Sequence, residues 1–344
     1  MKGNYETLTA LAARIEEVER SKQDYLVHTR AMEMDGDNTL VITPNGHTES
    51  FGIGEVAHSQ IAARLAIPKA YYDRMPQVPG LRAYTVNAWL GAQNEKRLVR
   101  TLDGNARAYL SDSFKPYDNF DVLSALLPTL KEHTNLKVWA QALTEKRMYL
   151  QVLFPNIAGE VKPGVLVAAG LVISNSEVGC GAVDVRSFLL NYVCSNGAVA
   201  ESLLNKYHVG RRVEDADYGI FRSDTVEADV KAFQLKLRDI VSTALDEARF
   251  QKKLAQMKGA AEDRINDPVK LIEKVTRRFG LSEAEGTKVM NNLITGGDPT
   301  RWGLSNAITA LAHEIESPDR QYDAESTGWD VVALSPSEWE VLNN

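Results

Sequence analysis

Between Arg82 and Ser195 the chain is dominated by short runs of β-branched and aromatic residues, which favour extended strands. Turn-forming residues separate these runs, among them LRAYTV, RMYLQVLF and VLVAAGLVIS, and NFDVLSALLPTL interrupts them with the apolar spacing of a helix. From residue 224 to residue 316 the spacing is helical throughout. The sequence therefore predicts an α+β fold: a mostly antiparallel sheet with packed helices, followed by an all-helical C-terminal region.

The chain divides by composition into three segments: an α+β domain over 1–223, a helical region over 224–316 and an acidic C-terminal segment over 317–344. One long amphipathic helix from about Asp224 to Lys258 is expected at the start of the helical region, and it carries more apolar positions than a short bundle needs. This surplus predicts that the protein is a homo-oligomer.

The acidic segment holds one basic and six acidic residues, together with Trp329 and Trp339. Two interpretations remain open. The segment is a tail that competes for a basic groove or recruits a protein partner, or GWDVVAL packs on the core and buries Trp329 and Val331.

Several classes of protein are disfavoured by composition. No apolar run is long enough to span a membrane, and the N-terminus is an acidic amphipathic helix, so a cytoplasmic protein without membrane contact is expected. Cys180 and Cys194 are too few for a disulfide framework, and the six histidines lie far apart. Neither a metal site nor another cofactor is expected.

Asp103-Gly104 lies between two strand-like runs and predicts a hairpin, because both positions tolerate a positive φ. With a two-residue turn, Leu98 faces Tyr109 and Arg100 faces Arg107. Facing like charges are destabilising, so an anion is expected between them, either a carboxylate of the protein or a phosphate. A bulge would instead slip the pairing by one residue and separate the arginines.

A basic residue followed two positions later by tyrosine recurs at Arg82-Ala83-Tyr84, Arg107-Ala108-Tyr109 and Arg147-Met148-Tyr149. In a strand the two side chains share a face, which suits a single-stranded nucleic acid, since cations follow phosphates and rings stack on bases. The alternative is that the tyrosines pack in the sheet and the arginines pair with carboxylates. The candidate nucleic-acid-binding residues are Arg82, Tyr84, Arg97, Arg100, Arg107, Tyr109, Lys115, Arg147 and Tyr149.

Signals for catalysis are weaker. SNSEVGCGAVDVRS contains Ser176, Glu177, Cys180 and Asp184, but no histidine lies within 20 residues to act as a base, so the stretch is interpreted as a hairpin turn. No catalytic residue is assigned.

Three stretches, RTLDGNARAYLSDSFKPYDNFDVL, FLLNYVCSNGAV with KYHVGRR after it, and RWGLSNAITALAHE, resemble a phage- and plasmid-associated family known as domain of unknown function 932 (DUF932) over roughly residues 50–330. The resemblance implies a DNA-handling role in a bacterial host cell. It implies in particular a single-strand-binding or annealing protein that assembles as a ring or filament.

The leading hypothesis is therefore a phage-type single-stranded DNA-binding protein that promotes annealing and needs neither metal nor nucleotide. A metal-dependent nuclease whose ligands are scattered in sequence is one alternative. A structural or host-interaction protein that blocks a bacterial defence system through its acidic segment is another.

Overall fold

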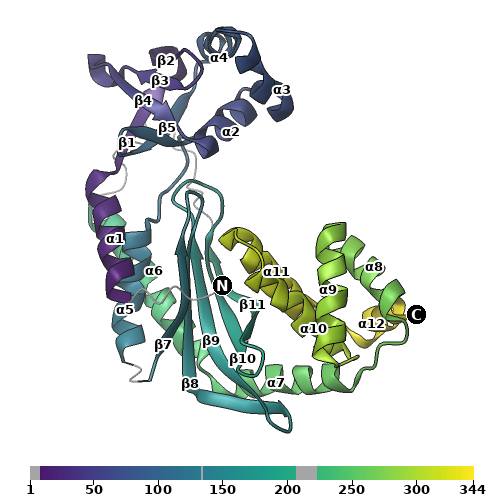
Figure 1. Cartoon of the computed structure of the whole chain (residues 1–344). Helices are drawn as coiled ribbons and strands as arrows, with labels where there is room; N and C mark the ends of the chain where they lie inside the picture. Colours follow the sequence, from purple (N-terminus) through teal and green to yellow (C-terminus); the bar gives the residue numbers. More distant parts are fainter. Residues whose placement is uncertain (1–7, 133–134, 207–222) are drawn as a thin grey trace.

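The structure is a computed structural model that describes residues 8–132, 135–206 and 223–344. Its strands form two separate sheets, one in an upper lobe (residues 23–111) and one in a lower lobe (residues 8–21 and the described residues from 119 onward) (Figure 1). Both sheets are largely antiparallel, helices pack on them, and the chain from Ser223 onward is helical. The predicted α+β class is confirmed.

The upper lobe holds a six-stranded sheet in the order β1-β5-β6-β4-β3-β2, in which only β4 and β6 pair in parallel. Its core lies between this sheet and three helices. The elements are β1 (Gln23–His28), β2 (Met32–Asp35), β3 (Thr39–Ile42), β4 (Glu49–Ile53), α2 (Glu55–Arg64), α3 (Lys69–Arg74), α4 (Leu81–Ala92), β5 (Lys96–Leu102) and β6 (Asn105–Ser111), with short 3₁₀ turns at Thr29–Ala31, Pro44–Gly46 and Met75–Gln77.

One strand expected in this lobe is a helix. LRAYTV opens α4, where Val86 and Leu90 are buried one turn apart on the face toward the sheet. The tertiary contact of this apolar stripe outweighs the local β propensity of Tyr84, Thr85 and Val86. In a helix, residues two apart do not share a face, so Arg82 and Tyr84 do not form the strand pair predicted from the repeated pattern.

The hairpin at Asp103-Gly104 is present, and its two turn residues have φ values of 47° and 75°. The predicted pairing of Arg100 with Arg107 is wrong, because Thr101 pairs with Ala106 while Arg100 pairs with Ala108. Arg107 is therefore the extra residue of a β-bulge, and Leu98 lies opposite Leu110 instead of Tyr109. The bulge separates the two guanidinium groups, as the alternative pairing anticipated.

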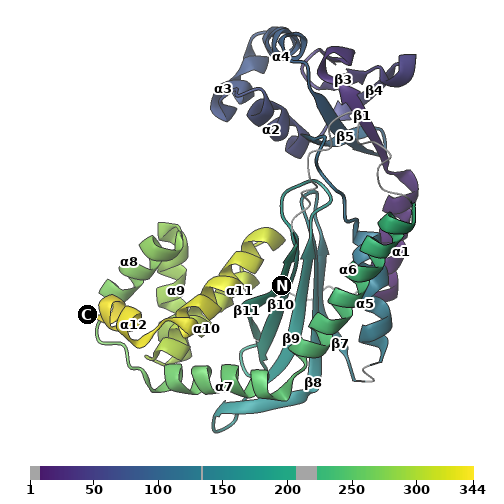
Figure 2. The same cartoon turned by 180° about the vertical axis from the view of Figure 1, so that it is seen from behind.

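The lower lobe is built around an antiparallel meander in the order β7-β8-β9-β10-β11. Helices cover both faces of this sheet (Figures 1 and 2), which explains why the strands are apolar runs without polar alternation. The strands are β7 (Lys137–Leu143), β8 (Met148–Lys162), β9 (Val165–Asn175), β10 (Val183–Asn191) and β11 (Asn196–Lys206).

On one face lie α1 (Leu8–Ser21), α5 (Asn119–Lys131) and α6 (Ser223–Ala244) (Figure 2). The long helix expected to reach Lys258 is broken, because the Asp246 side chain caps a new helix, α7 (Glu247–Glu262), and accepts a hydrogen bond from the Arg249 amide. Phe233 and Leu237 on α6 are buried against the sheet of the same chain. These apolar positions therefore no longer argue for self-association.

On the other face, α7 and the remaining helices form a bundle: α8 (Pro268–Phe279), α9 (Glu283–Gly296), α10 (Arg301–Thr309), α11 (Pro318–Ala333) and α12 (Pro336–Asn343). The side chains of Asp267, Ser282 and Thr300 cap α8, α9 and α10.

The acidic segment after residue 316 is folded into α11 and α12. Trp329, Val331 and Trp339 are all buried. The segment therefore packs on the core, which is the second of the two interpretations, and is not a free tail. Within the described ranges, no helix has the length and apolarity needed to cross a membrane.

Candidate functional site

The two lobes meet at the turn between β9 and β10, residues 176–182. As expected from its glycines, SNSEVGCG forms a hairpin turn, and the turn reaches into the upper lobe. Val178 is buried there against Val56 of α2 and against Ala108 and Leu110 of β6. Its carbonyl accepts a 2.7 Å hydrogen bond from the side-chain amide of Gln60. A lower-lobe turn thus completes a small apolar cluster in the upper lobe.

Next to this cluster, Glu177 links three elements. Its Oε2 accepts a 2.6 Å hydrogen bond from Nη1 of Arg107, and its Oε1 accepts a 2.7 Å hydrogen bond from the backbone N–H of Asn119 at the start of α5. Glu177 is only 6% exposed. Asn175, also buried, donates to the Asn119 side chain and so fixes α5 relative to the turn. The carboxylate is held in place by both lobes.

Arg100 lies behind this contact and is completely buried. Its guanidinium donates to Oδ1 of Asp24 (2.9 Å), to Oδ2 of Asp118 (3.1 Å) and to the backbone carbonyl of Glu177 (2.8 Å). Lys22 also donates to Asp118. Burial raises the pKa of Asp118, but the charges of Arg100 and Lys22 outweigh it and hold that pKa below its ordinary value.

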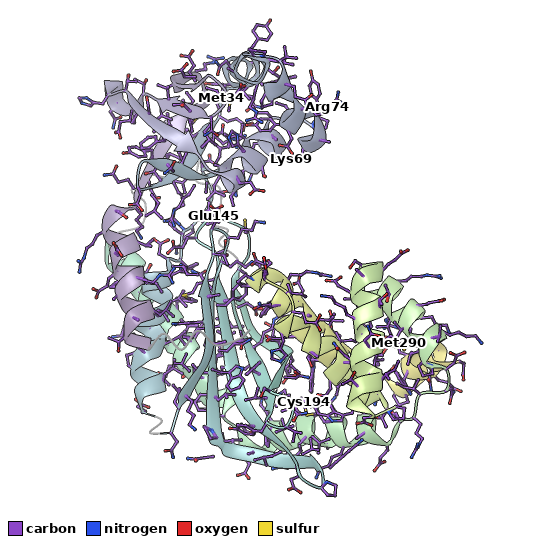
Figure 3. All side chains as sticks on the ribbon, in the orientation of Figure 1. Met34, Lys69, Arg74, Glu145, Cys194 and Met290 are labelled. Carbon is purple, nitrogen blue, oxygen red and sulfur yellow. The ribbon has the colours of Figure 1, made fainter. Side chains whose placement is uncertain are left out.

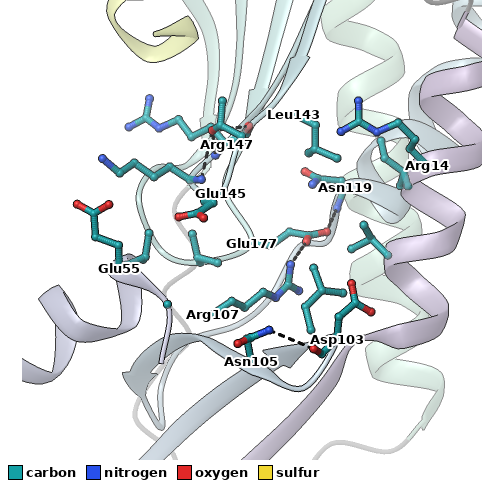
Figure 4. A pocket seen from close by; sticks show the side chains of 18 residues that line it. Arg14, Glu55, Asp103, Asn105, Arg107, Asn119, Leu143, Glu145, Arg147 and Glu177 are labelled. Carbon is teal, nitrogen blue, oxygen red and sulfur yellow. Dashed lines mark hydrogen bonds and ion pairs between the residues drawn. The ribbon is translucent and has the colours of Figure 1, made fainter. Parts of the chain in front are cut away.

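A pocket of about 570 Å³ lies between the two lobes, beside Arg107 and Glu177, and we call it the interlobe pocket. Its lining comes from α1, the start of α2, the β5–β6 hairpin, the β7–β8 turn and the β9–β10 turn (Figure 4). The basic side chains are Arg14, Arg107, Lys146 and Arg147. The acidic side chains are Glu55, Asp103, Glu145 and Glu177.

The structure brings two of the nine candidate residues, Arg107 and Arg147, to this pocket. Arg147 also donates from Nε to the carbonyl of Cys180 at 3.0 Å. Tyr109 and Tyr149 are buried inside the sheets, and the Tyr149 hydroxyl donates to Asp319 of α11. These two rings are therefore core side chains and present no face for stacking.

The other candidates lie apart from the pocket. In the upper lobe, Arg82 donates to the carbonyl of Asp37, and Tyr84 is 76% exposed on α4. Arg97 pairs with Glu95. Lys115 lies 5.7 Å from the centre of the Tyr117 ring. Both hairpin arginines meet protein carboxylates, which is one of the two anions that the sequence left open.

Sequence reasoning missed the partners of these arginines. Asp24, Asp118 and Glu177 are distant in sequence from the hairpin, and no spacing rule connects them to it. Glu177 stood out only as a member of a small polar stretch. Arg14 and Lys146 were also missed, because each is an ordinary exposed cation on a helix or a turn.

The side chains of Ser176 and Cys180, in the β9–β10 turn, do not have the environment of an activated nucleophile. Burial raises the pKa of the Cys180 thiol, which disfavours the thiolate, and Ser176 donates to the Lys146 carbonyl. In the parts of the chain that the structure describes, no three His, Cys, Asp or Glu side chains are grouped so that they could hold a metal ion.

Comparison with known proteins adds one relationship. The sequence model of the family described as domain of unknown function (DUF932) matches residues 108–327, which run from β6 into α11 and contain most of the lower lobe. No curated protein and no solved structure matches the chain. KYHVGRR, one of the quoted stretches, lies almost wholly outside the described residues. Because the match spans well over half of its length, the chain belongs to the DUF932 family.

Proposed function

We propose that the protein binds single-stranded DNA and promotes its annealing, and that the interlobe pocket holds a phosphate group of the strand. The observation that carries the proposal is the convergence of Arg14, Arg107, Lys146 and Arg147, from three separate elements, on one pocket. Arginine and lysine are the side chains that hold phosphodiesters in proteins.

Arg107 has unused donors at this pocket. Nη1 is occupied by Glu177, while Nε and Nη2 are enclosed and have no hydrogen-bond partner among the described residues. A guanidinium has five N–H donors in a planar fork that matches two phosphate oxygens. Enclosed donors without a partner are a sign that an anion or water belongs beside them. Because Arg107 lines the interlobe pocket, a rotation of its side chain would bring these enclosed donors to a phosphate held there.

The start of α2 adds backbone donors. Gly54 is the N-cap residue of this ten-residue helix and has no side chain to accept from the first turn, and Gly54, Glu55 and Val56 all line the pocket. Such N–H groups and the helix dipole favour an anion. Glu55 lies at the same end, so its carboxylate competes with a ligand at this position.

The pocket has equal numbers of basic and acidic side chains, so a broad electrostatic attraction is not expected from it. The proposal is a local one, with about one phosphate held by directed donors. Stacking on the sheet tyrosines is not part of it, because Tyr109 and Tyr149 are buried. The affinity of the pocket for DNA should therefore depend on salt only weakly, with a slope of about 0.7 per phosphate on a logarithmic scale.

Fluorescence anisotropy with a labelled single-stranded oligonucleotide, over a series of salt concentrations, tests the proposal. Lys146 is exposed and forms no ion pair with other described residues, so Lys146→Gln removes a cation without disturbing the fold. Combined with Arg14→Gln it should weaken binding about tenfold and flatten the salt dependence. Lys258→Gln, at an exposed position of α7, is the matched control and should bind like the unmodified protein.

Two results would contradict the proposal: no binding at low salt, or binding that the double variant and the Lys258→Gln control share equally. The same titration with magnesium addresses the alternatives. Cleavage of the oligonucleotide would favour the hypothesis of a metal-dependent nuclease. Absence of any binding would favour the hypothesis of a structural or host-interaction protein.

A further inference from the structure

A second pocket, of about 440 Å³, lies at the β10–β11 turn, at the end of β10 that is far from the interlobe pocket. We call it the amide pocket. Its lining comes from the β10–β11 turn, from the end of α9 and from α10. β10 runs from the turn at the interlobe pocket down to Asn191, a length of about 26 Å at the usual rise per strand residue. Figure 3 shows Cys194, at the amide pocket, far down the lower lobe from Glu145, at the interlobe pocket.

Four asparagines line this pocket, and the backbone fixes how their amides are turned. Asn191 accepts from the amide of Val193 at 3.0 Å, so its nitrogen is the atom that donates to Oδ1 of Asn306 at 3.2 Å. Asn306 is thereby left with Nδ2 as a donor. Asn292 uses Nδ2 to donate to the Ala307 carbonyl at 3.1 Å, which leaves its Oδ1 as an acceptor.

Nδ2 of Asn306 and Oδ1 of Asn292 are not enclosed by the protein. No described residue forms a hydrogen bond with either atom. Because both side chains line the pocket, one donor, on Asn306, and one acceptor, on Asn292, are available to a ligand there. Donor and acceptor atoms of asparagine side chains are among the groups that read the edges of bases.

The β10–β11 turn is held against α10 and the 3₁₀ turn after it by the side chain of Asn196. Asn196 donates from Nδ2 to the Asn306 backbone carbonyl at 3.0 Å, and its Oδ1 lies 2.8 Å from Nε2 of His313. Ser195, between Cys194 and Asn196, has a φ of 54°, a left-handed conformation that a residue with a Cβ adopts at a cost.

Charge and polarity narrow the class of ligand. The two charged residues in the lining, Lys162 and Asp298, form an ion pair at 2.8 Å. Each charge is therefore already balanced, and a charged ligand is not expected. Val165, Leu293 and Trp302 supply apolar wall. The volume falls within the range of about 300–1,000 Å³ that is usual for small-molecule sites.

We propose that the amide pocket binds an unpaired nucleobase. A base is uncharged, has apolar faces, and carries donors and acceptors on its edge, which fits the closed ion pair, the apolar residues and the two available amide atoms of the lining. The base can belong to a free nucleoside or to a single strand. Binding of a free nucleoside does not rest on the proposed DNA-binding function, since it involves no phosphate and a pocket remote from the first.

Calorimetric titration of the full chain with adenosine, guanosine, cytidine and thymidine tests the idea, with ribose as the negative control. Asn306→Asp keeps the acceptor used by Asn191 and replaces the free donor with a negatively charged oxygen that can only accept. It should weaken nucleoside binding about tenfold, as expected for one lost hydrogen bond in a pocket. Lys146→Gln, in the interlobe pocket, should leave nucleoside affinity unchanged, so failure of one proposal is separable from failure of the other.

Cys194 gives a second measurement that needs no substitution in the pocket. It is exposed and lies at the rim, so an occupied pocket should slow its reaction with a bulky maleimide, while the rate of half-buried Cys180 stays constant. Protection by nucleosides points to a small-molecule ligand, and protection only by single-stranded oligonucleotides points to a base within a strand. If neither protects Cys194, or if Asn306→Asp binds nucleosides as the unmodified protein does, the proposal is wrong.

Discussion

Arg107 and Glu177 are 70 residues apart and belong to different lobes, yet Nη1 of the arginine lies 2.6 Å from Oε2 of the glutamate. The β-bulge makes this contact possible, because it takes Arg107 out of the ladder with β5 and turns it away from Arg100. The glutamate in turn holds the first residue of α5. One ion pair therefore ties together the upper sheet, the lower sheet and a lower-lobe helix.

Replacing Glu177 with glutamine should destabilise the protein by about 2–3 kcal/mol, because it leaves the enclosed guanidinium of Arg107 without its charge partner. Urea unfolding of this variant, of Arg107→Gln and of the double variant gives the coupling between the two side chains, which should exceed about 1 kcal/mol. The exposed pair Arg238–Asp239 is the control, where Asp239→Asn should change the unfolding free energy by less than about 0.5 kcal/mol. Additive effects at Arg107 and Glu177 would mean that the contact does not join the lobes.

The C-terminal segment should be essential for stability. Trp329 is buried between α7, α10 and the lower sheet, and Trp329→Ala should cost about 3–5 kcal/mol through the cavity that it leaves. Val341, 73% exposed on α12, is a control whose replacement by alanine should have almost no effect. Thermal unfolding measures both. Trp329→Ala melting within a degree or two of the unmodified protein would show that the segment is a dispensable tail.

The fold class could be predicted because the periodicity of the sequence is strong in the lower lobe and in the bundle. The turn at Asp103-Gly104 is a local signal, and it appears where the sequence places it. The error at LRAYTV arose because burial of Val86 and Leu90 decides that segment, and burial depends on a sheet formed by other residues.

The site was harder to predict for the same reason. Which anion meets Arg100 depends on Asp24 and Asp118, and their approach depends on how β1 and α5 pack. The β-bulge at Arg107 shifts the pairing of β5 with β6 by one residue, and no sequence pattern at this hairpin predicts it. The sequence predicted that the hairpin arginines meet an anion, but it did not indicate whether that anion is a carboxylate or a phosphate.

Acid should loosen the helical bundle through Glu285. The hydrogen bond from Arg320, supported by Ser282 at the start of α9, lowers the pKa of Glu285 to about 2 from an ordinary value near 4.5. A depressed pKa means that this carboxylate stabilises the fold fully above about pH 4.5 and loses that effect as the pH falls toward 2. Glu285→Gln should show a shallower loss of unfolding free energy over this window. Equal slopes would indicate that Glu285 is not paired in solution.

Upper-lobe stability should depend on pH in a higher window, through His58. The ring lies between the Tyr72 hydroxyl, 2.7 Å from Nδ1, and the Asn38 side-chain oxygen, 2.7 Å from Nε2. Since the asparagine oxygen only accepts, Nε2 carries the proton and Nδ1 accepts from Tyr72, so the neutral ring is satisfied at both nitrogens. Burial, reinforced by the charges of Arg82 and Lys69, lowers the pKa of His58 to about 4.

In the unfolded chain a histidine takes up a proton near pH 6.5. Between about pH 6.5 and 4 the unfolded state therefore binds one more proton than the folded state at this position, and stability falls as the pH is lowered. Urea unfolding across this range should show that slope, and His58→Gln should remove it. Replacing His28, which is exposed on β1, should leave the slope unchanged. Proton NMR of the His58 ring is the direct measurement: a midpoint near pH 4 agrees with the buried neutral ring, and a midpoint near 6.5 would contradict the enclosure of His58 by Tyr72 and Asn38.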